Sequence, residues 1–524
     1  MTTPFNKRNW FNLDHDHKTT LDMGQLVPLP PIEVMPGDTF VMDQAFFSRL
    51  EAMIAPAYAD ISLFAYNFFV PYRILCEEKD WENFYTGGEQ GNSTLVFPYM
   101  TAPSGGYAVG SLADHLGIKP GIGGFKHSAM PFRAYAKIYN EWFRNQNFIS
   151  EIALSTAMGA DTTTNTTLMN KMWEKDYFTG ALPFTQRGTE ASIPFNDAPV
   201  AGNGMALGLN DGVDNTGITR CNLNGTQYLS AYNDLYGTNV GTTATGGTIV
   251  RTTSLGVTTD STKSGLVAKI SSANPVTINA LRWAFQVQKF LETQARGGAR
   301  MVETVLSHFG VRIPDARLQR SELIGAARMK VMISPVEQTS STDATTPQGN
   351  LAGRGTLNQG MRRVKHSFVE PGLIMTLVSF MPRTEYSQGL QRLWFHQDRY
   401  DFPWPVFSHT GEQEVMKGEL YLTSSDTTNR EVFGYNDRYA EHRHIPSSTS
   451  GLMRPDQSLG FWTLARQFAS MPQLNSNFVT SDPSKRIFAV TLQNVPCITL
   501  FYKNRCRALR PLPKYGYPGL IDHM

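Results

Sequence analysis

The strongest constraint on the fold is a set of strand-like segments separated by long irregular stretches. Thr39–Leu50 and Ala59–Val70 are rich in Phe, Tyr and β-branched residues with partial alternation, which is typical of half-buried strands. Similar segments lie at 26–32, 328–336, 365–370, 373–381, 486–495 and 498–508, and we expect the last two to pair across Pro496–Cys497. About eight antiparallel strands with such long insertions predict a mainly β fold. We expect an eight-stranded jelly roll, a two-sheet sandwich with loop and helix insertions, built as one domain over residues 1–524.

Helical periodicity is confined to a few segments. Residues 77–84 place Trp81 and Phe84 on one face, and residues 133–148 carry large apolar side chains three and four positions apart. A third helix is predicted after Pro275, with a break at Gly297–Gly298. It resumes over 299–309 and ends at Gly310.

Residues 186–275 form the clearest composition shift in the chain. They hold 13 Gly and 14 Thr in 90 positions, without Trp and without a sustained helical period. An irregular stretch of this length inside a compact domain is usually a functional insertion or disordered. Because Thr, Val and Ile alternate with the glycines, we expect an inserted surface module with short strands.

Charge and targeting signals limit the classes of function. The net charge of +2 with 18% charged residues excludes a polybasic protein, so any contact with nucleic acid has to be local. We expect no signal peptide and no membrane span, because no apolar run of the required length occurs. The four cysteines are scattered, which favours synthesis in the cytoplasm without structural disulfides.

Two polar clusters raise the question of metal binding. Asp14–His17 on a strand would place its two histidines on one face, and Glu441–His444 has a similar composition. A metal site needs three or four converging ligands, and neither cluster has an obvious partner. We interpret both as polar segments that lie against neighbouring chain or a neighbouring subunit. The Gly-rich segment 121–124 lacks the context of a phosphate loop, so we predict no catalytic residue, metal or cofactor.

The C-terminal region carries a basic run that suits a nucleic-acid contact. Its five cations are interleaved with Phe501, Tyr502 and Tyr515; they are Lys503, Arg505, Arg507, Arg510 and Lys514. Cations that neutralise phosphates and aromatics that stack on unpaired bases are what single-strand binding requires. Alternation would place the first three cations on one side of the last strand. A charged strand edge, or ion pairs with carboxylates of another subunit, explains the same pattern and stays open.

Several long segments, in order along the chain, match the pattern of a known family; they are 18–24, 33–40, 68–73, 295–311, 314–320, 338–349, 399–405, 432–441 and 515–523. Together they resemble the major capsid proteins of microviruses, specifically the gokushovirus-like group. The resemblance covers nearly the whole chain outside 186–275.

The resemblance implies a viral jelly roll that assembles with copies of itself into a T=1 icosahedral shell around circular single-stranded DNA. It places the 186–275 insertion at a protrusion on the threefold axes, where a host receptor would bind. Other implied partners are minor virion proteins: a pilot, an internal scaffold or a DNA-binding protein. We expect assembly in the bacterial cytoplasm and a final location in the virion capsid. The alternative is a carbohydrate-binding β-sandwich, whose surface aromatics would stack on sugars.

Overall fold

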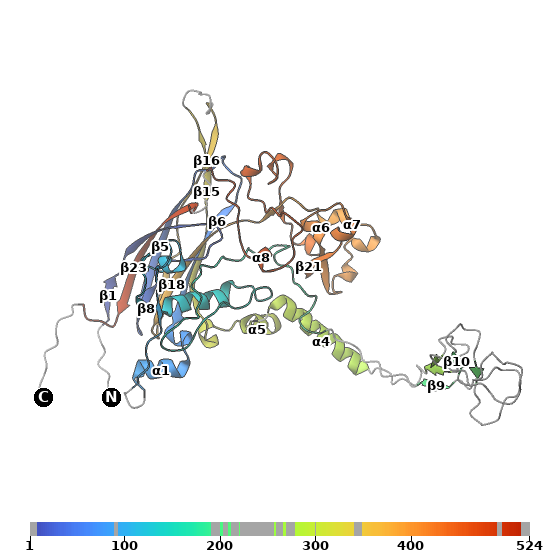
Figure 1. The fold of residues 1–524 in the computed structure, drawn as a ribbon, viewed down its shortest axis with the longest axis horizontal. Helices are drawn as coiled ribbons and strands as arrows, with labels where there is room; N and C mark the ends of the chain where they lie inside the picture. The colour runs from blue at the N-terminus through green and yellow to red at the C-terminus, as the bar shows by residue number, and fades with distance from the viewer. Residues whose placement is uncertain are drawn as a thin grey trace, which may run out of the picture. The chain divides into compact units, whose positions relative to one another are not determined.

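The computed structural model describes residues 8–88, 93–189, 278–298, 300–339, 348–489 and 495–514, with five short strands between 200 and 268. Contacts divide the chain into two units, residues 1–187 with 292–524, and residues 188–291. The first unit contains two large antiparallel sheets, which are described below and drawn in Figure 1.

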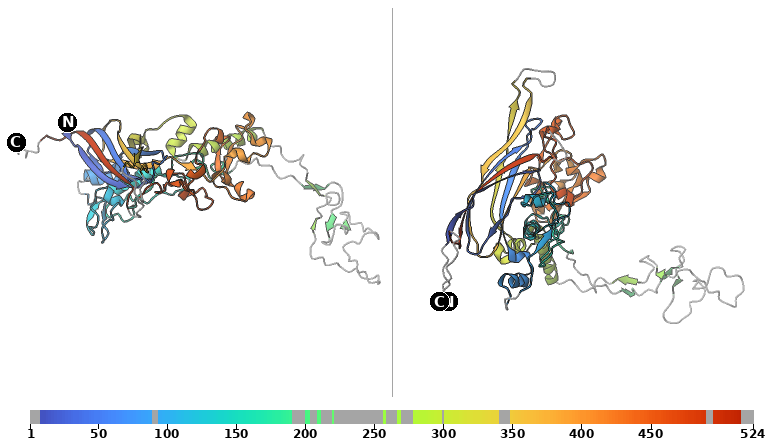
Figure 2. Two further views of the ribbon diagram at one scale, coloured as in Figure 1. Left: turned by 90° about the horizontal axis from the view of Figure 1, so that it is seen from above. Right: turned by 60° about the vertical axis from the view of Figure 1, so that its left-hand side comes forward.

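One sheet, the β23 sheet, is built from strands that come from both ends and the middle of the chain. Its members are β1 (Asn9–Asn12), β2 (His15–Leu21), β5 (Thr39–Leu50), β15 (Met332–Glu337), β16 (Leu351–Gly360), β17 (Val364–Ser367) and β23 (Ile498–Arg510). Strand β23 pairs with β5 on one side and with β1 and β2 on the other, all antiparallel. Figure 2 shows these long strands side by side.

The second sheet, the β6 sheet, faces the first across a hydrophobic core. Its members are β3 (Val27–Pro28), β4 (Ile32–Val34), β6 (Ile61–Pro71), β14 (Glu322–Lys330) and β18 (Gly372–Pro382). The core between the sheets includes Phe40 and Phe46 of β5, Leu63 and Phe69 of β6, and Val378 of β18. The fold is therefore mainly β, with two antiparallel sheets packed face to face, as the sequence predicts.

The two sheets differ in how many of their faces are covered. Strand β23 alternates buried and exposed residues, whereas β18 is buried at every position. The second face of the β6 sheet packs against a helical layer: α1 (Glu78–Thr86), α2 (Leu112–His115), α3 (Met130–Ile138) and the wide turn Tyr139–Phe143. Because helices cover this face, both faces of β6 and β18 are buried, and their sequences are mostly apolar. The β23 sheet, in contrast, has one face exposed to solvent.

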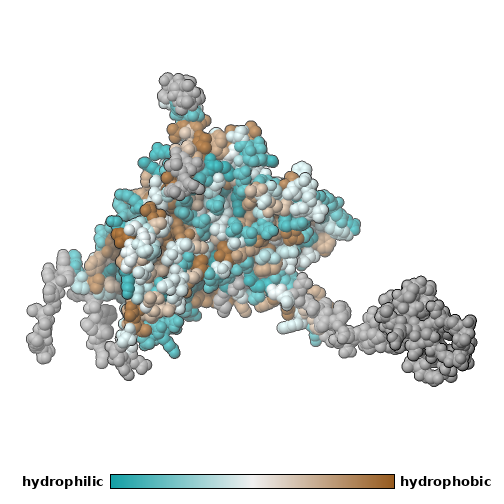
Figure 3. All heavy atoms as spheres, viewed as in Figure 1, coloured by the Kyte–Doolittle hydropathy of each residue, from teal (hydrophilic) through white to brown (hydrophobic). Residues whose placement is uncertain are grey.

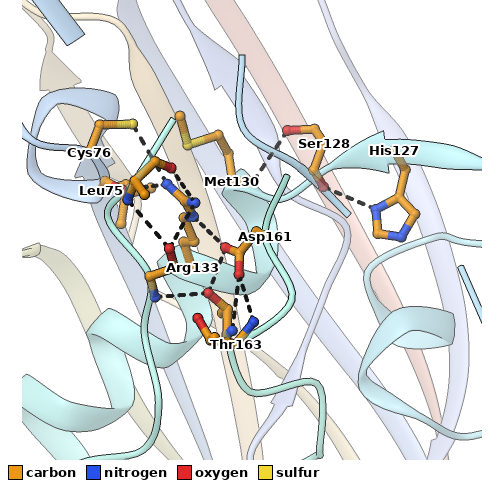
Figure 4. A network of polar contacts seen from close by, with 11 residues as sticks. Leu75, Cys76, His127, Ser128, Met130, Arg133, Asp161 and Thr163 are labelled. Carbon is orange, nitrogen blue, oxygen red and sulfur yellow. Dashed lines mark hydrogen bonds and ion pairs between the residues drawn. The ribbon is translucent and has the colours of Figure 1, made fainter. Parts of the chain in front are cut away.

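A buried ion pair holds the helical layer together. Nε of Arg133, on α3, lies 2.7 Å from Oδ2 of Asp161, and both side chains have no exposed surface. The guanidinium also donates to the carbonyls of Leu75 and Ala157, as Figure 4 shows in part. Burial alone would raise the pKa of Asp161, but hydrogen bonds from Thr164 and Arg133 hold it below its ordinary value. Every polar group of this pair is therefore compensated by a partner.

The remaining elements of the first unit are short. They are β7 (Tyr99–Thr101), β8 (Lys126–Ser128), α5 (Met301–Phe309), β19 (Glu385–Tyr386), β20 (Glu412–Met416), α6 (Lys417–Leu420), α7 (Asp426–Asn429), β21 (Val432–Asp437), β22 (Ser447–Ser448) and α8 (Ser476–Val479). Those between 385 and 480 gather around a second core that includes Phe178, Tyr386, Leu420 and Phe433. These elements form one lobe of the first unit, the 385–480 lobe.

Several predicted elements are confirmed and others are wrong. Strand β5 has the predicted bounds, β18 and β23 contain the predicted strands, and α5 ends at Gly310, whose φ is 68°. Among the described residues of the predicted strand 486–495, Arg486 and Ile487 lie in a turn and Phe488 makes an isolated bridge with Met53, so 486–489 do not form a strand. The predicted pairing of this segment with β23 is excluded because β1, β2 and β5 already occupy both sides of β23.

The predicted strand 328–336 is in fact two strands in different sheets. Strand β14 pairs with β6 up to Lys330, and β15 pairs with β16 from Met332 onward, so the chain changes sheets at Val331. The predicted helix 133–148 begins earlier, at Met130, and its α-helical part ends at Ile138. Strands β1, β2 and β16 are not among the strands that the sequence predicts.

The second unit contains short strands and most of α4 (Ile278–Gly297). The strands are β9 (Val200–Gly202), β10 (Gly208–Asn210), β11 (Thr219–Arg220), β12 (Gly256–Val257) and β13 (Leu266–Ala268). Most of the predicted insertion 186–275 lies outside the described residues, so its role as a surface module stays a prediction.

Candidate nucleic-acid interface

The last strand separates its side chains cleanly into two sets. Tyr502, Asn504 and Cys506 are buried toward the core, and the residues between them point to the open face of the β23 sheet. Lys503, Arg505 and Arg507 are exposed on that open face. This arrangement follows directly from the two-residue period of a strand, and it agrees with the predicted alternation.

Neighbouring strands add three more cations to the same face. In an antiparallel ladder, directly paired residues point to the same side of the sheet. Thr499 pairs with Arg49 of β5, Phe501 pairs with Lys18 of β2, and Val41 of β5 pairs with both Arg507 and Lys365 of β17. We call the resulting set the cationic face; its members are Lys18, Arg49, Lys365, Lys503, Arg505 and Arg507.

The cationic face carries more positive than negative charge. Among the outward positions of β1, β2, β5, β17 and β23, the carboxylates are Asp16 and Asp43, against six cations. Asp43 lies 3.5 Å from the guanidinium of Arg363, so another cation already pairs with it. Within the part of the chain that the structure describes, none of the six cations makes an ion pair. Their charge is therefore available to an anion outside the chain.

Aromatic rings lie among these cations. Phe47 of β5 and Phe501 of β23 are directly paired and half-buried. Lys18 lies 5.8 Å from the ring centre of Phe501, and Arg49 lies 5.3 Å from that of Phe47. An open pocket of about 660 Å³ adjoins both rings and reaches the loop at Val109–Gly110. Cations beside stacking surfaces are the combination that sequence-tolerant single-strand binding uses.

The structure separates Arg510 from the other predicted cations. Its Nε lies 3.3 Å from Oδ2 of the buried Asp38, its side chain donates to the Glu33 carbonyl, and its guanidinium lies over the Phe40 ring. Burial raises the pKa of Asp38, in spite of the hydrogen bond from Met35 and the charge of Arg510. Arg510 therefore stabilises the fold, and Lys514 lies exposed beyond the end of β23.

A buried polar cluster supports the cationic face from below. The Gln44 amide donates to the Tyr502 hydroxyl at 2.8 Å and exchanges hydrogen bonds with Asn67 of the β6 sheet. Thr376 of β18 donates to the Asn67 carbonyl oxygen at 2.7 Å. Burial raises the pKa of Tyr502 well above its ordinary value, so its hydroxyl stays neutral. The cluster fixes the position of β23 relative to the second sheet.

The histidines near the N terminus lie at the edge of the same sheet. His15 and His17 are half-buried on one face of β2, and Asp16 is exposed on the other, as expected for a strand. In the described residues no group of three or more metal-ligating side chains converges. Nδ1 of His115, the last residue of α2, lies 3.1 Å from the Thr19 hydroxyl, and this contact attaches α2 to β2.

Comparison with known proteins identifies the family. A family described as "Capsid protein (F protein)" matches residues 1–520. The chain is 36% identical to capsid protein VP1 of Bdellovibrio phage phiMH2K, over 98% of this chain and 95% of that protein. The chain belongs to this capsid protein family. It is also 33% identical to the VP1 capsid proteins of Chlamydia phage 1 and Spiroplasma virus 4, over 98% of this chain and at least 95% of each relative.

Membership of the F protein family confirms the resemblance to microvirus major capsid proteins. The chain is a structural capsid protein, which decides against the carbohydrate-binding alternative. Among the described helices, none is long and apolar enough to cross a membrane. The DNA contact through Lys503 and its neighbours stays a prediction.

Proposed function

We propose that copies of this chain build a T=1 icosahedral shell around circular single-stranded DNA, with the cationic face directed at the genome. The observation that carries the proposal is that six cations and two rings lie on one exposed sheet face, and that the cations make no ion pair with the described residues. This face is exposed in the single chain and rich in phosphate-binding groups, whereas the helical layer covers the β6 sheet on the opposite side.

The proposed fold is an eight-stranded viral jelly roll with long insertions, forming one domain over residues 1–524. Two antiparallel sheets around one core, with strands from both ends of the chain in the same sheet, support it. We further propose that residues 186–275 form a threefold protrusion that binds the host receptor. Minor virion proteins (pilot, scaffold or DNA-binding protein) would complete the particle in the bacterial cytoplasm.

A charge-removal variant tests the DNA contact. Replacing Lys503, Arg505 and Arg507 together by Gln should leave the shells intact but reduce the DNA that they retain. Loss of each phosphate contact lowers the log–log salt dependence by roughly 0.7, so salt should have less effect on the DNA that remains. The measurement is DNA per particle over a salt series, together with the ratio of empty to filled shells.

The matched control removes three exposed cations away from the β23 sheet: Lys79, Lys119 and Arg383. This control should retain DNA like the unmodified chain. Normal shells with less DNA, for the strand variant alone, support the proposal. Loss of shells before any DNA enters would instead show that these cations pair with carboxylates of another subunit.

A further inference from the structure

The lobe between 385 and 480 exposes an unusual number of large apolar side chains. Six of them, with 49% to 82% of their surface exposed, lie within fourteen residues; they are Leu393, Trp394, Tyr400, Phe402, Trp404 and Val406. Over the face drawn in Figure 3, hydrophobic residues are mostly interspersed with hydrophilic ones. We call the set of six the aromatic surface. Such concentration of exposed apolar groups marks an interaction site.

The aromatic surface is held in a defined shape by its own hydrogen bonds. The Asp401 carboxylate accepts from the backbone N–H groups of Gln397 and Asp398 at 2.7 and 2.9 Å. The Trp404 indole donates to the Arg399 carbonyl at 2.8 Å, and its backbone N–H donates to the Tyr439 hydroxyl at 3.0 Å. Little conformational entropy is then lost when the surface is covered, which favours binding.

A pocket of about 300 Å³ adjoins the aromatic surface on the same lobe. Its apolar lining includes Phe178, Tyr386, Leu390, Ile445 and Pro446. Leu393 also borders this pocket, together with three imidazoles, those of His396, His442 and His444. The pocket is large enough for an aromatic ring, and much of its lining is apolar.

The wall of the pocket contains more carboxylates than cations. Arg392 lies 3.2 Å from Glu419 and 3.7 Å from Glu441, so one guanidinium is shared by two carboxylates. The Glu441 oxygens also accept from Gln413, and the Glu441 side chain is still 16% exposed. A second cation entering the pocket would therefore find a carboxylate that is incompletely neutralised.

The aromatic surface carries a cation suited to that wall. The Arg399 guanidinium lies 4.7 Å from the Tyr400 ring centre and donates to the Tyr400 hydroxyl. In the described part of the chain, Arg399 makes no ion pair with a carboxylate. Arginine, tyrosine and tryptophan are the residues that most often dominate binding energy at interfaces.

We propose that the aromatic surface of one copy docks against the pocket of a second copy, where Arg399 meets Glu441. The proposal rests on the proposed shell function, because a shell requires heterologous contacts that close by symmetry. Charge complementarity selects a second copy as the occupant, because every subunit carries both the Arg399 cation and the partly exposed Glu441 carboxylate. Burial of the six apolar side chains supplies the driving force.

Charge reversal tests the contact directly. Arg399→Glu should reduce the yield of particles by about tenfold or more, because one interface residue of this kind changes affinity by at least that factor. Glu441→Arg should do the same, and the double variant should recover most of the loss. The particles are counted by sedimentation and electron microscopy. Circular dichroism of each unassembled chain checks folding, since Glu441 also contacts Arg392 and Gln413.

Substitution of two exposed valines, one inside and one outside the aromatic surface, provides an independent test that leaves the pocket unchanged. Val406→Asp places a charge in the aromatic surface, and Val369→Asp is the matched control, since the two valines are 82% and 83% exposed. We expect Val406→Asp to block association of a folded chain and Val369→Asp to leave it unchanged. Equal effects of the two variants would overturn the proposal.

The remaining outcomes are distinguishable. Normal particles from Arg399→Glu and Val406→Asp would overturn this contact while the shell function stands. Normal particles that no longer infect would show that the occupant is a different protein, such as a receptor. Absence of particles from the unmodified chain under every condition would instead contradict the proposed function itself.

Discussion

Gln44 and Asn67 join the two sheets through a reciprocal pair of amide hydrogen bonds. Gln44 Nε2 donates to Asn67 Oδ1 at 3.2 Å, and Asn67 Nδ2 donates to Gln44 Oε1 at 2.9 Å. Both side chains are almost completely buried. Each amide therefore satisfies the other inside the buried core, and the pair fixes the position of β5 relative to β6 in the facing sheet.

Removal of both amides should cost less than the sum of the two single removals, because the two side chains act as a coupled pair. Gln44→Met leaves the Asn67 amide buried with fewer partners, which should lower the free energy of unfolding by about 1–3 kcal/mol. Adding Asn67→Leu should cost less than the sum of the two single changes. Urea denaturation of the unassembled chain, analysed as a double-mutant cycle, measures this coupling. Strictly additive losses would show that the pair does not act as a unit.

The ion pair between Arg133 and Asp161 should be far more sensitive than a surface pair. Arg133→Met leaves the buried Asp161 carboxylate without its ion-pair partner, which should lower the free energy of unfolding by about 3–5 kcal/mol. The control is Arg430→Met, which removes the exposed pair with Asp426 and should cost about 0.5 kcal/mol or less. Thermal unfolding of both variants measures the difference. Similar shifts of the unfolding midpoint would contradict the view that the buried Arg133–Asp161 pair matters more for stability than a surface pair.

Stability should fall on mild acidification because burial lowers the pKa of three histidines, among them His17 and His115. Burial, and then the charge of His15, lowers the pKa of His17, and burial lowers the pKa of His115. The unfolded chain therefore binds protons first as the pH falls below about 6.5. This contribution to stability is present above that pH and is lost below it.

The measurement is the free energy of unfolding of the unassembled chain between pH 8 and pH 5. Replacing His17 and His115 by Gln should flatten the decrease over this range relative to the unmodified chain. The same double change at two exposed histidines outside β2 and α2, His409 and His444, serves as the control. If replacing His17 and His115 leaves the decrease in unfolding free energy with pH unchanged, these two histidines do not cause it.

The structure also predicts which cations matter for DNA beyond the C-terminal run. Lys18→Gln with Arg49→Gln should reduce DNA retention and its salt dependence, because both side chains extend the cationic face beside Phe501 and Phe47. Arg510→Gln should instead destabilise the fold, because Arg510 pairs with the buried Asp38. DNA per particle and the thermal unfolding midpoint, measured on both variants, separate DNA contact from fold stabilisation. A lower midpoint for the Lys18/Arg49 variant, or a loss of DNA alone for Arg510→Gln, would contradict these roles.

Local patterns were sufficient for many individual elements. The alternation of residues 498–508 predicts both the strand and the common face of Lys503, Arg505 and Arg507, because a two-residue period depends only on neighbouring residues. The end of α5 at Gly310 is predicted for a similar reason, since a left-handed residue after the last turn strongly favours glycine.

Strand pairing depended on the tertiary structure. The sequence around Val331 continues a strand-like pattern, yet the chain passes there from the β6 sheet to the β23 sheet. The predicted partner of β23 was wrong because backbone hydrogen bonds are the same with any strand, and local periodicity therefore cannot select among partners distant in the chain.

The sequence by itself determined the family, the β character and the position of a basic strand. Only the tertiary structure showed that Lys18, Arg49 and Lys365 lie on the same exposed face as that strand's cations. It also showed that Arg510 forms an ion pair with the buried Asp38 instead. The physical reason is that a surface is assembled from residues far apart in sequence. Their charges lie on one face only after strands distant in the chain have paired. Strand pairing and burial then determine which side chains are exposed to solvent and which contact each other.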